Sequence, residues 1–326
     1  MTLRLILFFL SMTFCHADFL KKIELSNKCK IHFASTNKAK ELLGKRDVYI
    51  EGLSSFERAA KIKKSGPIST DEYIKFIQDQ AIEWPEEDKI KLSKVIAKAK
   101  IKLSHLASHL PNNITFIKTS GADEGGAPYT RGNSIILPKR QVSQSVKALE
   151  RLFYHELFHI ISRNNQQLRD ELYSIIGFKP CGVVKLPDNM MPLRISNPDA
   201  PIIEHCIRIS FEDKKHWVAP VLFSRIPKYN PKTGDTFFRY LEFRLMPIDI
   251  KTTKPILNID KPTLLKPDEV EGFFDQIGRN TSYILHPEET LANNFVFLIT
   301  EKKDLKNPEI PKKIKLVFEK LDSKKN

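Results

Sequence analysis

The sequence has few cysteines and no CxxC pair, which argues against a disulfide scaffold and against a cysteine-based metal site. Four cysteines occur in 326 residues, and Cys15 lies in an N-terminal segment that we expect to be removed. Cys29, Cys181 and Cys206 remain. An oxidising location would permit one bridge, and Cys181 with Cys206 is the pair to test, because both flank the same predicted β region.

Long apolar runs and phosphate-binding motifs are also missing. Beyond the N-terminus, no window approaches the roughly 18 apolar residues that a membrane-spanning helix needs. The glycine loop 120–126, SGADEGG, has neither the GxGxxG nor the GxxxxGK[ST] spacing and opens no helix, so we expect no phosphate cradle. We interpret this loop, with Asp123 and Glu124, as a solvated turn rather than as a calcium site.

The charge is strongly unbalanced. The 53 Lys and Arg residues exceed the 39 Asp and Glu residues, which gives a net charge of +14. A basic chain favours anionic partners. However, the basic residues are spread along the whole length and no nucleic-acid-binding module is recognisable, so we interpret them as a solvated surface and expect no nucleic-acid partner. A hydrophobic content of 41% predicts a folded core.

The N-terminal segment has the features of a secretory signal. Arg4 gives a positive start, and Leu5–Leu10 begin an apolar core that is too short to span a membrane. Cys15 and Ala17 place small residues at the −3 and −1 positions of a cleavage site. We expect cleavage after Ala17, an exported location that is periplasmic or secreted, and no stable membrane anchor afterwards. An uncleaved anchor is the alternative.

Periodicity and composition predict an α+β protein with five segments. The signal peptide covers 1–17, and an N-terminal helical region covers 18–110. A central core covers 111–178, a β-rich insertion covers 179–262, and a segment with two further helices covers 263–326.

Helix-capping residues and the alternation of side chains in strands predict the boundaries of individual helices and strands. Pro85 and the acidic residues after it start a helix that should run to about His109. Within the β-rich insertion, strands are expected at Ile202–Phe211, Trp217–Arg225 and Thr236–Pro247, the last because alternate residues are apolar or aromatic.

The most informative stretch is 145–159, SVKALERLFYHELFH, which contains His155, Glu156 and His159 in an HExxH pattern. Apolar residues recur at three- and four-residue spacing, which predicts a helix over about Ser143–Ser162. Positions i and i+4 lie on one helix face, so both imidazoles can point at one metal ion. Glu156 lies about 100° round the helix, which suits a carboxylate that deprotonates a zinc-bound water. The motif therefore predicts a Zn²⁺ site.

A catalytic zinc normally has a third protein ligand. The HExxHxxGxxH pattern fails at its Gly and at its last His, so the ligand must come from elsewhere. A Glu on a downstream helix is the other route, and residues 286–294, HPEETLANN, fit it. Glu289 and Asn293 would share one face, so Glu289 can bind zinc and Asn293 can accept from the far nitrogen of a ligand histidine. Glu288 is the rival third ligand.

At these positions the sequence resembles the gluzincin zinc peptidases, the thermolysin-like class, which carry HExxH on one helix and a Glu on a second. The resemblance covers His155, Glu156, His159, Glu289 and Asn293. It implies a zincin-like core that hydrolyses peptide bonds by Glu-assisted attack of zinc-bound water. The gap of 130 residues between His159 and Glu289 is longer than in typical members, and the β-rich insertion would fill it.

The resemblance also implies an edge strand beside the active site, along which the substrate lies extended, and Tyr129–Leu137 is the candidate. A cationic or phenolic group usually stabilises the oxyanion. Tyr283, His286 and Arg131 are candidates, with Tyr283 preferred. The resemblance thus predicts a zinc peptidase that acts on peptide or protein substrates, and the N-terminal signal predicts that it is exported. The alternative is a catalytically inactive secreted binding protein with the same metal fold.

Overall fold

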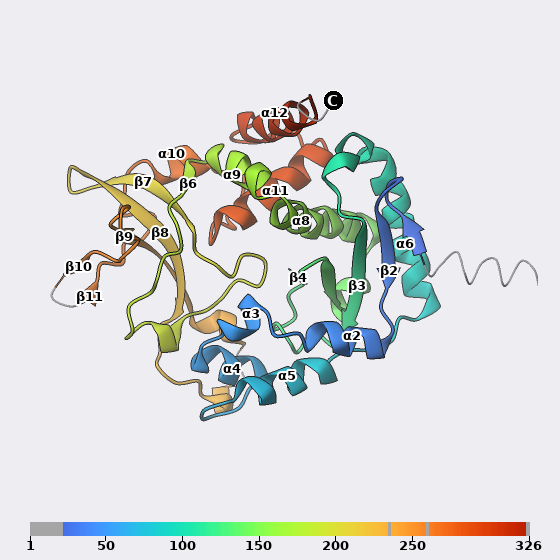
Figure 1. Ribbon diagram of the computed structural model, residues 1–326, viewed down its shortest axis with the longest axis horizontal. Helices are drawn as coiled ribbons and strands as arrows, with labels where there is room; N and C mark the ends of the chain where they lie inside the picture. Colours follow the sequence, from blue (N-terminus) through green and yellow to red (C-terminus); the bar gives the residue numbers. More distant parts are fainter. Residues whose placement is uncertain (1–21, 234–235, 259–260, 324–326) are drawn as a thin grey trace, which may run out of the picture.

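The structure, a computed structural model, describes residues 22–233, 236–258 and 261–323, and the expected signal peptide lies outside them. These residues form a mixed α and β structure, as the sequence predicts. A five-stranded sheet lies to the right in Figure 1 and a four-stranded sheet to the left, with the helices α8 (Val146–Asn164) and α11 (Pro287–Ile299) between them.

The five-stranded sheet has the order β1-β2-β3-β5-β4. The strands β2, β3 and β5 are parallel, and β1 and β4 pair with them antiparallel at the two edges. Their bounds are β1 Lys22–Glu24, β2 Lys30–Phe33, β3 Asn113–Thr119, β4 Tyr129–Arg131 and β5 Ser134–Pro138.

The predicted edge strand Tyr129–Leu137 is a hairpin rather than one strand. Its first part, β4, is the edge, whereas β5 lies inside the sheet. The chain reverses at Gly132, whose φ of 53° belongs to the left-handed region. A two-residue loop with positive φ matches the twist of paired strands, so Gly132 and Asn133 turn the chain back between Arg131 and Ser134.

Five helices occupy most of the N-terminal region. Ser54 and Glu57 form the capping box that starts α4, with both reciprocal hydrogen bonds present. The helix expected to reach His109 ends at Lys102, and a 3₁₀ helix, η1 (Ser104–His109), follows it. The five helices are α2 Thr36–Leu43, α3 Val48–Glu51, α4 Ser55–Ile62, α5 Thr70–Asp79 and α6 Glu86–Lys102.

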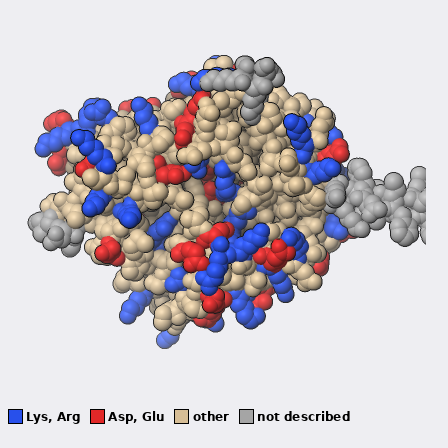
Figure 2. Space-filling model, viewed as in Figure 1, with Lys and Arg blue, Asp and Glu red and all other residues tan. Residues whose placement is uncertain are grey.

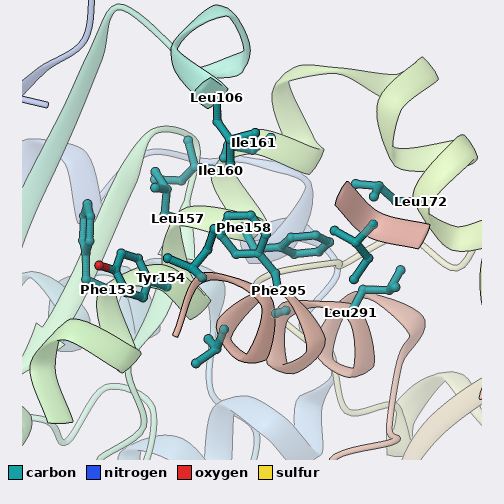
Figure 3. Close-up of a cluster of buried hydrophobic side chains, with 14 of the residues drawn as sticks. Leu106, Phe153, Tyr154, Leu157, Phe158, Ile160, Ile161, Leu172, Leu291 and Phe295 are labelled. Carbon is teal, nitrogen blue, oxygen red and sulfur yellow. The ribbon is translucent and has the colours of Figure 1, made fainter. Parts of the chain in front are cut away.

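The main core joins α8 to α11. The rings of Phe158 and Phe295 are fully buried, with centroids 5.5 Å apart, and Figure 3 shows them with Leu291 between the two helices. Truncating a buried Phe to Ala typically costs about 3–5 kcal/mol, so this contact fixes the spacing of the helices. The other helices of this part are α7 Lys139–Val142, α9 Gln166–Ser174, α10 Phe273–Ile277 and α12 Glu309–Ser323.

The β-rich segment forms an antiparallel sheet of order β6-β7-β8-β9. The strand predicted at Thr236–Pro247 starts later, because Phe237–Tyr240 is a 3₁₀ helix, η4. Phe237 and Tyr240 are both buried, and three-residue spacing puts them on one side of a 3₁₀ turn but on opposite faces of a strand. The bounds are β6 Phe178–Pro180, η2 Met191–Leu193, β7 His205–Phe211, β8 Lys214–Ser224, η3 Pro231–Thr233, β9 Leu241–Ile248, β10 Leu257–Asn258 and β11 Lys261–Pro262.

The glycine loop after β3 is not a solvated turn, because Asp123 and Glu124 are buried. Asp123 accepts a hydrogen bond of 2.8 Å from the hydroxyl of Tyr129. Glu124 accepts from the hydroxyl of Tyr49 and, at 2.9 Å, from the ammonium of Lys61. Buried acids persist where such partners surround them. The partners come from α3, α4 and β4, so the loop sequence alone could not reveal them.

The distribution of charged residues on the surface agrees with the even spread of Lys and Arg along the sequence. On the face in Figure 2, Lys and Arg are interspersed with Asp and Glu and do not gather into one large patch. Among the described residues, no helix is both long enough and apolar enough to cross a membrane.

Candidate metal centre

The helix α8 presents two imidazoles side by side. The side chain of Ser145, the N-cap residue of α8, accepts a hydrogen bond from the backbone amide of Ala148. The apolar face of α8 is buried against the five-stranded sheet and α11. This burial fixes the rotation of the helix. His155 and His159, one turn apart, therefore face the same side, with ring centroids 4.8 Å apart and perpendicular planes. His159 is buried, and His155 is partly exposed.

The first turn of α11 supplies a carboxylate to this pair. Oε2 of Glu289 lies 3.1 Å from Nε2 of His155 and 3.7 Å from Nε2 of His159. Pro287 starts α11, and Nδ1 of the N-cap residue His286 accepts from the amide of Glu288 at 3.1 Å. One ligand atom from each of His155, His159 and Glu289 lies within 4.8 Å of the others. These three residues could hold a metal ion.

The donors and the charges around His159 suit a divalent cation. In the described part of the chain, Nε2 of His159 is buried without a hydrogen-bond partner, which is costly in a protein interior unless another ligand satisfies it. Burial lowers the pKa of His159, but the carboxylates of Asp199 and Glu289 outweigh it and raise this pKa to about 10. The cluster of carboxylates around one imidazole is what a bound cation would neutralise. Two imidazoles and one carboxylate are also a donor set that zinc accepts.

Glu288, the rival ligand, contacts the opposite side of the same imidazole. Its Oε1 lies 2.9 Å from Nδ1 of His159. The hydroxyl of Ser162 donates to its two oxygens at 2.7 and 2.8 Å, and the hydroxyl of Tyr173 donates as well. Burial raises the pKa of Glu288, but the hydrogen bond and charge of His159 outweigh it, so the net shift is downward. An ionised Glu288 holds the proton of His159 on Nδ1 and leaves Nε2 free for a ligand bond.

Glu156 lies beside this cluster and is almost fully buried. Within the described chain, its Oε2 has no hydrogen-bond partner. Burial, followed by the charge of Asp199, raises the pKa of Glu156 well above its ordinary value. Carboxylates with raised pKa values in a cavity are suited to proton transfer.

Two residues of the loop before β7 complete the centre, and neither of them was predicted from the sequence. The amide of Asn197 donates to Oε1 of Glu289 at 2.7 Å, so only Oε2 faces the histidines. A carboxylate oxygen of Asp199 lies within 4.8 Å of ligand atoms of Glu156 and His159. Its Oδ1 accepts from the backbone N–H of Thr130 at 2.8 Å and from the Thr130 hydroxyl at 2.6 Å. Their stretch, SNPDA, has the composition of an ordinary turn.

The structure separates the candidates for oxyanion stabilisation. The ring of Tyr283 stacks on that of His155, with centroids 6.2 Å apart and planes 17° apart. The charge of Glu289, followed by burial, raises the pKa of Tyr283, so its hydroxyl stays protonated. His286 is buried at the cap of α11. Arg131 is buried against Asp47 at 2.9 Å. Of the three candidates, Tyr283 lines the cavity beside the centre.

Asn293 lies one turn beyond Glu289 on α11. Its amide donates to the backbone carbonyl of Glu289 at 3.3 Å, so this bond stays within the helix. The acceptor at the far nitrogen of His159 is Glu288. Asn293 and Glu289 line a cavity of about 310 Å³ together with residues of α8 and of several other segments. Its remaining lining residues are Ala127, Pro128, Gln141, Gln144, Arg151, Leu152, His155, Glu156, Asp199, Tyr283 and Val296.

The cysteines lie away from this centre. Cys29, Cys181 and Cys206 are free thiols. The thiol of Cys206 donates a hydrogen bond to Cys181, which lowers the pKa of the Cys181 thiol. Cys206 belongs to β7 and Cys181 directly follows β6, and both lie at the small core of the β-rich segment.

No family model, curated protein or solved structure matches this chain.

Proposed function

We propose that this chain is an exported zinc-dependent peptidase of the gluzincin type. The observation that carries the proposal is the convergence of His155, His159 and Glu289 from two packed helices, with a buried Nε2 of His159 that has no partner in the described chain. His₂Glu sets with an open position are characteristic of zinc peptidases. Export stays a prediction from the N-terminal segment.

The proposed roles follow from the contacts of each group. A zinc ion at this centre would acidify a water molecule and polarise the carbonyl of the substrate. Glu156 accepts the proton of the attacking water and delivers it to the leaving amine, which its raised pKa favours. The protonated hydroxyl of Tyr283 donates to the oxyanion that forms on the carbonyl. Asn197 and Glu288 orient Glu289 and His159.

Metal analysis and a peptidase assay test the proposal together. The mature protein should contain about one zinc per chain and should cleave a library of quenched fluorescent peptides. Glu156→Gln should retain the zinc and lose cleavage by about two orders of magnitude or more, as expected for a general base. A protein that folds and binds no zinc would contradict the proposal. Zinc binding without cleavage by the wild type would favour the inactive binding protein instead.

A further inference from the structure

One cationic side chain of the cavity beside the centre is not used by the proposed chemistry. Arg151 lies four residues before His155 on α8, and both line this cavity. Four helical residues rise about 6 Å, so Arg151 lies one turn from the metal ligands along the helix axis. The same cavity is also lined by three neutral polar side chains, those of Gln141, Gln144 and Asn293.

Arg151 has no hydrogen bond or ion pair with another described residue, and its side chain is exposed. The acidic residue next to it, Glu150, is already paired with Lys102 at 3.1 Å and with the hydroxyl of Tyr154 at 2.9 Å. The carboxylates that line the cavity belong to Glu156, Asp199 and Glu289, and none of them is paired with Arg151. Glu289 is hydrogen-bonded to Asn197 and His155 instead.

We infer that Arg151 is a specificity-determining residue that binds a carboxylate of the substrate; this inference rests on the proposed peptidase function. An extended peptide advances about 3.3 Å per residue, so a separation of about 6 Å corresponds to about two residues. The carboxylate therefore belongs to an acidic side chain, or to the C-terminus, one or two residues from the cleaved bond. A guanidinium can bind either one through two parallel hydrogen bonds.

The test compares peptides that differ only in this charge. In the first kind of pair, the two peptides have Glu or Gln at one position, and each of the two residues on either side of the cleaved bond is varied in turn. In the second kind of pair, the C-terminus is free in one peptide and amidated in the other. The wild type should prefer the charged member of one pair by about tenfold or more in kcat/KM, the range of a hydrogen bond to a charged group. The pair that shows the preference identifies the source of the carboxylate.

Variants assign this preference to Arg151. In Arg151→Gln, the ratio of kcat/KM between the charged and the neutral peptide should be close to one. Arg151→Glu should instead prefer a peptide that has Lys at the same position. Lys147→Gln, an exposed position one turn earlier on α8 that does not line the cavity, is the matched control and should keep the wild-type ratio. Equal cleavage of both members by the wild type, or a wild-type ratio in Arg151→Gln, would overturn the inference.

Peptide-binding measurements test the role of Arg151 independently of whether the protein cleaves peptides. The dissociation constants of the labelled peptides are measured with zinc-loaded Glu156→Gln, with and without Arg151→Gln. A preference of about tenfold for the charged peptide that disappears with Arg151→Gln supports the inference even if the wild type cleaves nothing. Equal binding of charged and neutral peptides overturns it even if the wild type is an active peptidase.

Discussion

Glu288 and Glu289 are neighbours in the first turn of α11, yet they contact opposite nitrogens of His159. Oε1 of Glu288 lies 2.9 Å from Nδ1, and Oε2 of Glu289 lies 3.7 Å from Nε2. One helix start thus supplies both a candidate ligand and the group that orients another ligand.

Replacing Glu288 should weaken metal binding without removing it. Glu288→Gln takes away the anion at Nδ1 of His159, and loss of such a partner typically lowers metal affinity by about 10–100-fold. Glu289→Gln removes a candidate ligand and should weaken binding more. Zinc titrations against a competing chelator measure both. Glu87→Gln, an exposed first-turn Glu of α6, serves as control. The reverse order of the two effects would make Glu288 the ligand.

Asn197 should control how Glu289 presents its oxygens. Its amide occupies Oε1 of Glu289 at 2.7 Å, and Asn197→Ala releases this oxygen. We expect a loss of zinc affinity of about tenfold for Asn197→Ala and for Asn197→Asp, because neither side chain can donate a hydrogen bond to Oε1 of Glu289. The absorption spectrum of the cobalt-substituted protein should change in both variants. An unchanged spectrum and affinity would show that Asn197 does not position the ligand.

Tyr283 should affect turnover rather than metal binding. Its hydroxyl is protonated, and its ring stacks on His155 at 6.2 Å. If it donates to the oxyanion, Tyr283→Phe should lower kcat by about 10²–10³ with little change in zinc content, the range for loss of one such donor. Steady-state kinetics together with metal analysis measure this. A kcat within about twofold of the wild type would remove Tyr283 from the mechanism.

Protonation of His286 should lower the free energy of unfolding at acidic pH. Burial lowers its pKa from 6.5 to about 4, and its Nδ1 accepts from the amide of Glu288 only when unprotonated. Because the folded pKa lies below the unfolded one, the folded state binds fewer protons than the unfolded state between these values. The resulting stability is complete above about pH 6.5 and is lost as the pH falls towards 4, by about 3 kcal/mol in total.

Denaturant unfolding of the metal-free protein between pH 7 and pH 4 tests this. His286→Asn keeps an acceptor at the cap but does not titrate in this range. Between pH 7 and pH 4, the free energy of unfolding of this variant should therefore decrease by about 3 kcal/mol less than that of the wild type. An identical pH dependence in the wild type and the variant would rule out His286 as the source.

Lys61 should be essential for stability although it lies outside the candidate metal centre. Its ammonium is buried, 2.9 Å from Glu124 and 3.4 Å from Glu57. Lys61→Met leaves both carboxylates without their cation, and breaking a buried ion pair typically costs about 3–5 kcal/mol. Lys63→Met, an exposed position at the end of the same helix, should change stability by less than about 0.5 kcal/mol. Thermal or denaturant unfolding compares the two, and equal costs would refute the prediction.

The local part of the arrangement could be predicted from the sequence. The capping serine and the apolar spacing specify α8 within a few residues, and helical geometry then puts His155 and His159 on one face. Pro287 likewise predicts where α11 starts, and the structure brings Glu289 to the histidines. The division of roles between Glu288 and Glu289 depends on the angle between two helices, so the sequence left it open.

The rest depends on contacts between distant segments. Asn197 and Asp199 reach the centre because Ser196 is hydrogen-bonded to Glu57 of α4 and Asp199 to Thr130 of β4, and no periodicity encodes such contacts. Asp123 was predicted to be solvated for the same reason, since its buried partner Tyr129 lies on another element.

The bond between Thr130 and Asp199 also limits how β4 can be used. The Thr130 N–H belongs to the free edge of the five-stranded sheet, where an unpaired donor can recruit a strand from another chain. The carboxylate of Asp199 satisfies this donor internally, and the guanidinium of Arg163 joins the Thr130 hydroxyl to the Asp199 carbonyl. Aggregation by strand addition is therefore suppressed at β4. Any peptide that paired with β4 at Thr130 would first have to displace a carboxylate that also faces the candidate metal centre.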